Sequence, residues 1–345
     1  MAATPSPEEL EAMLLKAIPR FRWTAEDAVK GLDLKGKTII VTGATSGIGI
    51  PTATALARTG CNLTITARDP AKGAAALESI QKESGNPEVK VSALDMCSYE
   101  SVKAFAKEWG ERPIDVLLHN AGVMAIPYTM TADKEEQQMQ VNFHSVVLLT
   151  ELLLPRLTDS ARVCVVSSVA HRRCATLETP FMELFEKYAF QGIEKEGYDK
   201  WVAYYVAKSA IIMYCNHLNA ELTQKGSKIR VNSCHPGGIR TGLQDSLTKE
   251  EMISYGWMDK DGNVSPVFKT VEQGASTSTW VSVSAEMEGI GGTYSENCAV
   301  TAKDDFGTGD LLSRVKGTAP HVWVESDCAK VSESARAHLK DKGLL

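Results

Sequence analysis

The sequence predicts an α/β protein, a doubly wound parallel sheet in a single domain with an extension at each end. Its 345 residues include 43% hydrophobic residues, which suffices for one large core. Short apolar strand-like runs alternate with helix-like segments along most of the chain. The first such run, "TIIVTG", leads directly into a glycine-rich loop. Short strands separated by helices indicate a parallel sheet that helices cover on both faces.

The predicted elements follow one another in a regular strand and helix rhythm. The first half of the chain predicts strands and helices in strict alternation, at 38–43, 49–58, 62–67, 71–83, 90–95, 98–109 and 114–122. The second half predicts one long helix, a strand, a helix and a strand, at 135–156, 162–168, 199–222 and 228–238. This order is a series of βαβ units, which builds a parallel sheet.

Charge and cysteine content exclude several classes of protein. The formal net charge of -6 comes from 37 basic and 43 acidic residues spread along the chain, so no basic stripe is available for nucleic acid. The eight cysteines lie far apart without a CxxC pair, as expected of thiols in a reducing cytosol. The N-terminus lacks signal-peptide features, and no window reaches the roughly 18 apolar residues that span a bilayer. We therefore expect a cytoplasmic protein without a transmembrane segment.

Three glycines stand where the first strand ends and a helix begins, in "KTIIVTGATSGIGI". Gly43 permits a tight turn, Gly47 lets backbone amides approach a pyrophosphate, and Gly49 lets the next helix pack closely on the sheet. Parallel sheets bind ligands beyond the carboxyl ends of their strands, which is where this loop lies. The alternative is an ordinary glycine-rich loop, and the motifs that accompany it argue against that alternative.

The spacing of these glycines, GxxxGxG, resembles the fingerprint of the short-chain dehydrogenase/reductase superfamily. Five further stretches match that family in order: "LD" at 94–95, "NAG" at 120–122, "VVSS" ending at 168, "YYVAK" at 204–208 and "HPGGIRT" at 235–241. The stretches "ARDPAKG", "SSVAHR" and "GGTYSENCAV" are most similar to the retinol-dehydrogenase and WW-domain-oxidoreductase-like branch. The resemblance implies a Rossmann-type sheet and hydride transfer between a nicotinamide cofactor and a carbonyl or alcohol.

The resemblance divides the chain into three parts. Residues 1–35 are an N-terminal extension with the amphipathic segment "PEELEAMLLKAI", residues 36–300 are the Rossmann domain, and residues 301–345 are a C-terminal extension. Within the domain, residues 169–203 are an insertion and residues 242–265 are a substrate lid. We expect the insertion either to cover the substrate entrance or to alter a helix surface that many family members use to dimerise. A homodimer is one assembly that this leaves open.

The motif "YYVAK" suggests a proton-transfer group. A tyrosine and a lysine four positions apart lie on one face of a helix, which brings the ammonium of Lys208 near the phenol of Tyr204. A tyrosine of ordinary pKa, about 10, is a poor acid or base at neutral pH, and the lysine together with an oxidised nicotinamide would lower that pKa. Lys208 also matches the family's ligand for the cofactor ribose. Tyr205 has Ser209 at its fourth position and is assigned to packing or to the substrate wall.

Two further polar residues complete the expected catalytic set. Ser168 ends a buried strand, where its hydroxyl can hold the substrate oxygen against Tyr204. Ser167 competes for this role, but the two serines alternate between faces and the family pattern places the catalytic one second. Asn142 matches the helix asparagine that in this family helps to position a water near the catalytic lysine; alternatively it stabilises a helix distortion. Ser145 stands where the family often has glycine.

The remaining cofactor contacts follow from the resemblance. Asp95 is expected to meet the adenine, Asn120 and Gly122 to border the cofactor, and Ile239 and Thr241 to lie near the nicotinamide amide. The full expected set comprises Gly43, Thr45, Ser46, Gly47, Ile48, Gly49, Arg68, Asp95, Met96, Asn120, Ala121, Gly122, Tyr204, Lys208, Pro236, Gly237, Ile239 and Thr241.

The end of the second strand indicates the choice of cofactor. An acidic residue there would accept a hydrogen bond from the ribose 2′-hydroxyl and repel a 2′-phosphate. Here the residue is Ala67, and the next is Arg68, whose planar guanidinium pairs well with a phosphate. This favours NADP(H). Asp69, which can neutralise Arg68, and Ser46, where many NADP-preferring relatives have a basic residue, count against it. The alternative for Arg68 is a solvated loop charge.

A small lipophilic carbonyl or alcohol is the expected substrate. The lid segment carries apolar side chains that either line the pocket or only pack a lid helix: Leu243, Leu247, Met252, Ile253 and Trp257. The histidines fit no HExxH or clustered ligand pattern, so no metal site is expected, and His171 and His235 are assigned to loop or core.

The expected function is NADP(H)-dependent hydride transfer on a lipophilic carbonyl or alcohol. A non-redox isomerase or dehydratase on the same fold would retain the same residues and is the alternative enzyme. A cofactor-sensing scaffold protein would have no need of Ser168, Tyr204 and Lys208 together, and all three are present.

Overall fold

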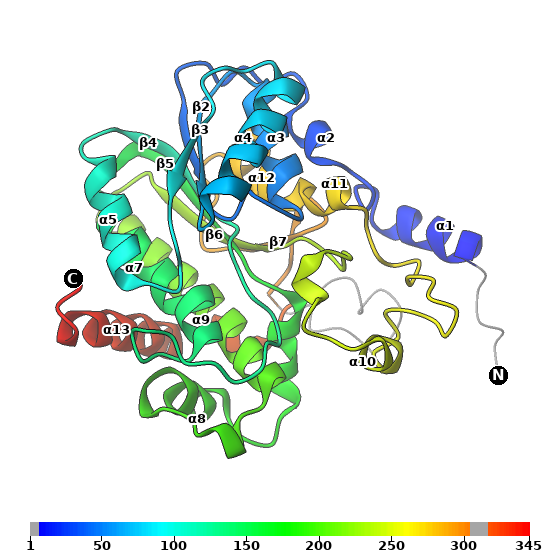
Figure 1. Ribbon diagram of the computed structural model, residues 1–345, viewed down its shortest axis with the longest axis vertical. Helices are drawn as coiled ribbons and strands as arrows, with labels where there is room; N and C mark the ends of the chain where they lie inside the picture. Colours follow the sequence, from blue (N-terminus) through cyan, green and yellow to red (C-terminus); the bar gives the residue numbers. More distant parts are fainter. Residues whose placement is uncertain (1–6, 304–316) are drawn as a thin grey trace.

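The centre of the protein is one eight-stranded sheet, in a computed structural model that describes residues 7–303 and 317–345 (Figure 1). The strands pair in the order β3-β2-β1-β4-β5-β6-β7-β8, and every pair is parallel except the last. Neighbouring β1 and β4 are separated along the chain by two other strands. The predicted doubly wound parallel sheet is therefore confirmed, and the reversal between β1 and β4 creates the crevice at which such sheets bind ligands.

The strands include the six predicted apolar runs, although β5 begins at Leu157 and not at 162, and two further strands that are not predicted, β7 and β8. They are β1 (Thr38–Val41), β2 (Asn62–Ala67), β3 (Lys90–Ala93), β4 (Ile114–His119), β5 (Leu157–Val166), β6 (Arg230–His235), β7 (Tyr294–Glu296) and β8 (Ala299–Val300). The central strands are apolar and buried because helices cover both of their faces. Because the strands are parallel, the loops that follow them lie together at the carboxyl edge of the sheet.

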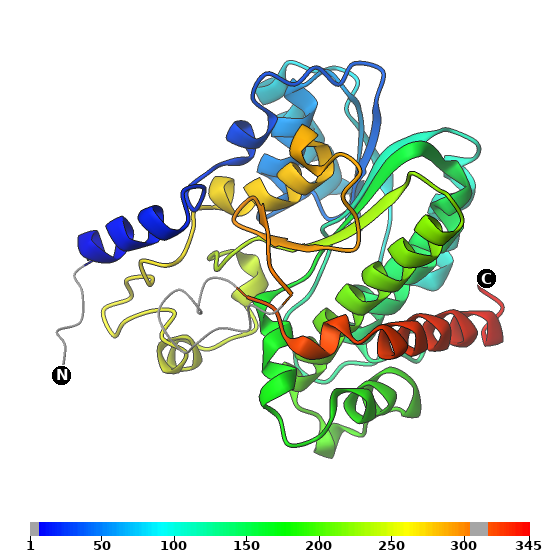
Figure 2. The same ribbon diagram turned by 180° about the vertical axis from the view of Figure 1, so that it is seen from behind.

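Two layers of helices sandwich the sheet (Figures 1 and 2). One layer packs on β1 and β2 in a core of small and aliphatic side chains, and consists of α3 (Gly49–Arg58), α4 (Pro70–Ser84) and α12 (Ser276–Val283). The opposite layer has a larger core and consists of α5 (Tyr99–Trp109), α7 (Ser145–Leu153) and α9 (Lys200–Gln224).

Helix α9 is buried on all sides through its middle, since every residue from Val206 to Cys215 is buried. A helix that is buried all round needs a cover on its outer side as well as the sheet on its inner side. The cover is α13 (Glu325–Asp341), which lies against α9 in both ribbon views and for which the sequence analysis predicts no element. Helix α8 (Phe181–Glu186) of the predicted insertion packs on the same helix.

Arg336 links α13 to two helices of the domain through ion pairs. Its Nε lies 2.7 Å from a carboxylate oxygen of Glu151 on α7, and its Nη2 lies 2.7 Å from Glu221 on α9. The apolar side of the same helix buries Val331 and Leu339 in the core of the α9 layer. The outer surface of α7 and α9 is thus covered by the chain itself.

The predicted helical stretch over 135–156 is confirmed for 137–156, but it is not one regular α-helix. A short helix α6 (Gln137–Met139) is followed by a π-helical turn at Gln140–His144, and only then does α7 begin. The cause is a tertiary bond: the Asn142 side chain accepts from the backbone N–H of Val123 and donates to its C=O, at 3.0 and 2.9 Å. A π-turn widens the helix by one residue per turn and lets Asn142 make both bonds.

The two ends of the main domain carry smaller helices. The predicted amphipathic segment near the N-terminus forms α1 (Pro7–Ala17), and α2 (Ala25–Val29) packs on α12. The lid region contains α10 (Lys249–Ser254) and is followed by α11 (Val271–Gly274). Among all helices in the described part of the chain, none is long and apolar enough to cross a bilayer.

Replacing Leu339 by alanine should lower the free energy of unfolding by about 2–5 kcal/mol, because it leaves a cavity beneath α13. Leu345→Ala is the matched control, since Leu345 lies nearby in sequence but is 39% exposed. Denaturant titration of the two variants measures the difference. Equal stabilities would contradict the packing of α13 described above.

Candidate active site

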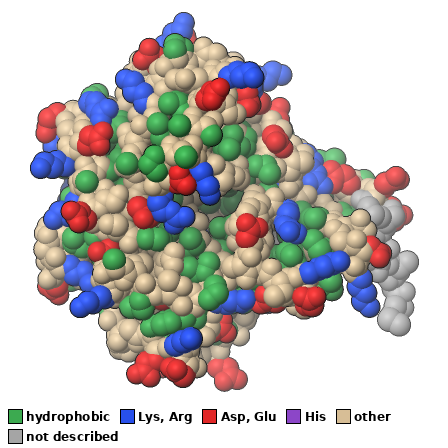
Figure 3. All heavy atoms as spheres, viewed as in Figure 1, with side chains coloured by type: hydrophobic (Ala, Val, Ile, Leu, Met, Phe, Trp, Pro, Cys, Tyr) green, Lys and Arg blue, Asp and Glu red, His purple; other side chains and the backbone are tan. Residues whose placement is uncertain are grey.

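One large cleft, with a volume of about 1910 Å³, lies at the carboxyl edge of the sheet. Its wall contains the residues that follow four neighbouring strands, namely Gly43, Asn120, Ser168 and Pro236. The face seen in Figure 3 is hollowed near its centre, and charged side chains of both signs are interspersed with hydrophobic ones around the hollow. All predicted cofactor residues, from Gly43 to Thr241, line this cleft, as does Ser168.

The glycine loop is packed too tightly for larger residues. A Cβ at Gly43, whose φ is +68°, would lie 2.6 Å from the Cα of Ala121, and a Cβ at Gly49 would lie 2.3 Å from the Gly43 carbonyl oxygen. The amide of Asn120 donates hydrogen bonds to the carbonyls of Thr42 and Gly43, at 3.1 and 2.9 Å. The loop is therefore held against the end of β4 in one conformation.

The loop leads into the N-terminus of α3 at the wall of the cleft. Within the described chain no side chain caps this helix start at Ile48. The Gly49 N–H donates to the Ser46 carbonyl at 3.2 Å and Pro51 has no N–H, so the backbone N–H groups of Ile48 and Ile50 are the ones that can face an anion. Gly47 has φ +51°, and a Cβ there would meet only Thr241, at 3.5 Å. Space and donors at this point fit the pyrophosphate of a dinucleotide.

Ser168, Tyr204 and Lys208 converge beside this loop although two of them come from one helix and the third from the end of β5. The Tyr204 phenol is buried and hydrogen-bonds with the Ser168 hydroxyl. The Lys208 Nζ lies 5.8 Å from the centre of the Tyr204 ring and donates to the carbonyl of Val166 at 2.9 Å. Ser167 instead donates its hydroxyl to the backbone carbonyl of Lys208, at 2.7 Å. Ser168 thus contacts the Tyr204 side chain, whereas Ser167 contacts the backbone of α9.

Burial governs the titration of this group. It raises the pKa of Tyr204 to about 12, while the hydrogen bond with Ser168 acts in the lowering direction. Burial also lowers the pKa of Lys208 to about 8. The sequence predicts that Lys208 together with an oxidised nicotinamide lowers the pKa of Tyr204, but among the protein's own groups burial outweighs the hydrogen bond with Ser168.

Asn142 lies behind the wall of the cleft and not in it. Its two hydrogen bonds to Val123 secure the loop that contains Gly122, where a Cβ would lie 3.0 Å from Asn142 Oδ1 and 3.6 Å from Lys208 Nζ. The alternative role considered for Asn142, stabilising a helix distortion, fits this geometry directly. Ser145, where the family often has glycine, donates its hydroxyl to the carbonyl of Met96 at 2.7 Å.

Next to the end of β2 the cleft has a basic residue that the sequence does not predict. Arg68 lines this part of the cleft, and so does exposed Lys72 in the first turn of α4. The Asp69 carboxylate accepts hydrogen bonds from the backbone N–H groups of Ala71 and Lys72, at 2.8 and 3.2 Å, and so caps that helix. The signal for Lys72 was the "DP" helix start in "ARDPAK", which places the third residue after Asp69 beside the loop.

A sequence model of the family described as "short chain dehydrogenase" matches residues 37–179 and 192–252. The chain belongs to the short-chain dehydrogenase family. A "Probable oxidoreductase" from Streptomyces antibioticus is 36% identical over 271 residues, which cover 77% of this dehydrogenase and 86% of that relative. These matches identify it as an oxidoreductase that uses a nicotinamide cofactor and acts on an alcohol or carbonyl group.

Retinol dehydrogenases are among the relatives. Retinol dehydrogenase 13 from Mus musculus is 32% identical, covering 88% of this chain and 86% of the relative. Retinol dehydrogenase 11 from Homo sapiens is 34% identical, covering 84% and 87%. The dehydrogenase therefore lies in the retinol-dehydrogenase-like branch. Among solved structures, an uncharacterised protein from Mycobacterium paratuberculosis is similar at a TM-score of 0.65 and 28% identity, covering 91% of this chain and 97% of that one.

Aromatic side chains line the part of the dehydrogenase cleft that adjoins the predicted lid. The Trp201 ring stacks on Tyr205, with centroids 5.8 Å apart, and contacts Tyr255 and Trp257 edge-on. Its Nε1 donates to the Tyr255 hydroxyl at 2.9 Å. Trp201 stands at the end of the predicted insertion and Tyr255 in the predicted lid, so the two segments meet at the cleft.

The lid residues divide between two roles. Leu243 and Trp257 line the cleft, whereas Leu247 and Met252 pack beneath the lid in a small core that includes Tyr204. Residues that the sequence analysis misses also line the cleft, including Trp201 and Tyr255, the N-terminal Leu10, Met13 and Phe21, and His235 at the end of β6. No local sequence pattern distinguishes them, because they come together only in the fold.

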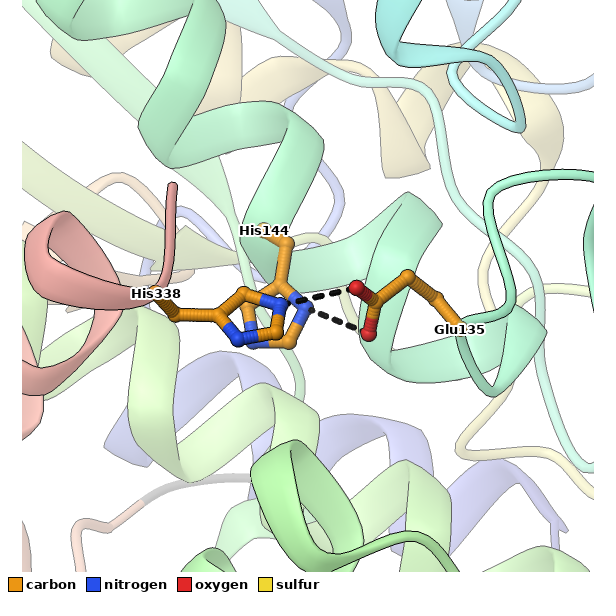
Figure 4. Close-up of side chains that lie close together, drawn as sticks. All are labelled: Glu135, His144 and His338. Carbon is orange, nitrogen blue, oxygen red and sulfur yellow. Dashed lines mark hydrogen bonds and ion pairs between the residues drawn. The ribbon is translucent and has the colours of Figure 1, made fainter. Parts of the chain in front are cut away.

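The expectation of isolated histidines needs correction, because Glu135, His144 and His338 lie together (Figure 4). The His338 Nε2 lies 2.7 Å from one oxygen of the Glu135 carboxylate, and the His144 Nδ1 lies 3.6 Å from the other. The Lys342 ammonium lies 2.9 Å from the same oxygen as His338. Burial would raise the pKa of Glu135, but these neighbours together hold it below its usual value. The cluster thus links α13, through His338, to the π-turn, through His144.

Gly43→Ala should destabilise the fold by more than Gly85→Ala. Both positions have positive φ, +68° and +71°, so each substitution costs about 1–2 kcal/mol from backbone strain. Only position 43 adds a collision with Ala121, because nothing lies within 4 Å of a Cβ at position 85. Thermal unfolding of both variants tests this, and equal midpoints would contradict the tight packing of the loop.

Proposed function

We propose that this dehydrogenase transfers hydride between NADP(H) and a lipophilic carbonyl or alcohol. The observation that carries the proposal is the convergence of Ser168, Tyr204 and Lys208 on the same cleft as the glycine loop. A protein that only senses the cofactor would need the loop without a buried acid and base beside it. When bound, the nicotinamide supplies or accepts the hydride.

The residues of the chain move and hold the proton. The Tyr204 phenol gives its proton to the substrate oxygen during carbonyl reduction and takes it back during alcohol oxidation. With a pKa of about 12 it is protonated at neutral pH, which suits the reducing direction. Ser168 donates a hydrogen bond to the same substrate oxygen. The Lys208 ammonium, anchored to the carbonyl of Val166, stabilises the phenolate that forms as the proton leaves.

Support for NADP(H) comes from the charges at the end of β2. Arg68 and Lys72 both line the adenosine end of the cleft, where Ala67 leaves no carboxylate to repel a 2′-phosphate. The Asp69 carboxylate, which the sequence analysis counts against Arg68, accepts bonds from the backbone of α4. Lys72 supplies the second basic residue that Ser46 does not.

Support for a lipophilic substrate comes from the aromatic wall formed by Trp201, Tyr205, Tyr255 and Trp257. Such a wall stabilises flat apolar molecules through buried area and ring contacts. The cytoplasm is the proposed compartment, since all eight cysteines are free thiols. If the protein forms a homodimer, it does so through a face other than the surface of α7 and α9 that α13 covers.

Tyr204→Phe should reduce turnover by roughly 10²-fold or more while preserving fold and cofactor binding, because it removes the proton-transfer group. Tyr205→Phe is the matched control at the neighbouring position. Absorbance at the nicotinamide band, with a panel of carbonyls and alcohols, measures turnover. Near-normal turnover of the Tyr204 variant would refute the mechanism. Product formation by the parent without a net absorbance change would identify a non-redox enzyme.

Arg68→Ala and Lys72→Ala should each weaken binding of NADPH by about 10-fold or more and leave NADH nearly unchanged, because only NADPH has the 2′-phosphate. Lys82→Ala, at the far end of α4, is the control for a lost positive charge. Fluorescence titration with both cofactors gives the affinities. Equal weakening of the two cofactors would reject these residues as phosphate ligands.

A further inference from the structure

His171 is a buried polar residue that the proposed mechanism does not use. It belongs to the motif "SSVAHR", three residues after Ser168, and lies in the 3-10 turn Val169–Thr176. Its side chain has no exposed surface, yet both ring nitrogens have partners. The sequence analysis assigns it to loop or core, and its hydrogen bonds give it a more specific position.

The partners of the ring fix its tautomer. The backbone N–H of Ala319 lies 3.1 Å from His171 Nε2, and because an amide N–H can only donate, Nε2 carries no proton. The ring is neutral at physiological pH, since burial lowers its pKa to about 3. Its one proton is therefore on Nδ1, which donates to the backbone carbonyl of Ser168 at 2.6 Å.

This bond acts on the residue that would hold the substrate oxygen. The Ser168 carbonyl also accepts from the His171 backbone N–H at 3.1 Å. It therefore accepts two hydrogen bonds from His171, one from the ring and one from the backbone. The Ser168 Oγ accepts from the backbone N–H of Ala170 at 3.1 Å. A hydroxyl that already accepts one hydrogen bond still has its proton to donate, and the two constraints together limit where that proton can point.

The other side of the ring rests on the C-terminal extension. Ala319 is fully buried, and two residues further on the His321 Nε2 lies 3.0 Å from the Ser209 hydroxyl, next to Lys208 on α9. The Ser209 hydroxyl in turn lies 3.3 Å from the His171 carbonyl oxygen. The Tyr294 ring of β7 contacts the His171 ring edge-on, with centroids 5.0 Å apart. The imidazole is thus enclosed by the C-terminal segment, the sheet and α9.

We propose that His171 is a positioning residue for Ser168, and that the C-terminal segment Ala319–Trp323 is the outer support through which it acts. The proposal rests on the function proposed for Ser168. It goes beyond that function because residues that are distant from Ser168 in the sequence, Ala319–Trp323, help to hold Ser168 in place. A buried histidine that only filled space would not need a defined tautomer.

Two substitutions separate the two hydrogen bonds of the ring. The amide of asparagine can occupy the place of Nδ1, so His171→Asn retains a donor to Ser168 and loses the bond to Ala319. The longer glutamine reaches the place of Nε2, so His171→Gln retains an acceptor for Ala319 and loses the bond to Ser168. Both variants lose one bond and ring volume, which makes each the control for the other.

We expect turnover of His171→Asn to fall by no more than about 3-fold and that of His171→Gln by roughly 10- to 100-fold, the scale for a misplaced catalytic group. Cofactor affinity should change little in either. In a Ser168→Ala background the difference between the two variants should vanish. Equal losses of turnover that follow the loss of thermal stability would overturn the proposal and leave His171 as a core residue.

A crystal structure of each variant provides a test that needs no turnover. We expect the distance from Ser168 Oγ to the Tyr204 hydroxyl to be preserved in His171→Asn and lengthened in His171→Gln. An unchanged distance in both would overturn the proposal. A parent protein that shows no turnover with either cofactor would instead refute the proposed function, and the two structures would still decide whether His171 positions Ser168.

If neither His171 variant folds, Ala319→Pro tests the same contact from the other side. Ala319 has φ -86° and ψ 141°, close to the range of proline, which has no N–H to donate and whose Cδ would take the place of that hydrogen and displace His171 Nε2. We expect a 3- to 10-fold loss of turnover with normal cofactor affinity. Unchanged turnover in a folded Ala319→Pro protein would overturn the role of the C-terminal segment.

Discussion

The position of Lys208 is the constraint on which the rest of the site depends. A buried ammonium is tolerated only if it is hydrogen-bonded, and Lys208 donates to the carbonyl of Val166 at the end of β5. The Ser167 hydroxyl returns a bond to the Lys208 carbonyl, so strand end and helix are joined twice. This fixes α9 along and around its axis, and with it the phenol of Tyr204 one turn earlier. Ser168, two residues past the end of β5, then faces that phenol and hydrogen-bonds with it.

In this position the outer side of α9 would expose apolar side chains to water if other parts of the chain did not cover it. The helix is buried through its middle, and its outer side is covered by α13 and by α8 of the insertion. Polar contacts also hold α13 in place: Arg336 pairs with the carboxylates of Glu151 and Glu221, and His338 contacts the carboxylate of Glu135. Packing and hydrogen bonding therefore connect the C-terminal segment to both the π-turn and the serine loop. The extension is as much a part of the site's support as the sheet is.

The sequence predicted those features of the fold that depend on residues close together in the chain. The alternation of apolar runs predicted seven successive elements from 38 to 122, because period and turn residues are read from neighbours in sequence. The expected cofactor residues lie in short contiguous motifs at strand ends, and this is why sequence alone could bring them to one cleft. The helical stretch over 135–156 was predicted, but its π-turn entered only through an alternative role for Asn142, since the bond from Asn142 to Val123 joins residues distant in sequence. The pairing of Glu135 with His338 and of Trp201 with Tyr255 had no sequence signal for the same reason.

The burial of α9 has a consequence for how the protein is made. Helix α9 leaves the ribosome well before α13, and at roughly 5–20 residues per second the interval is on the order of ten seconds. During that time the sheet can form while the outer side of α9 still faces water. Such an intermediate presents an apolar stripe that chaperones bind and that a second nascent chain could pair with. Helix α13 then covers the outer side of α9, and the segment that precedes it, Ala319–Trp323, makes the contact with His171 at the same stage of synthesis.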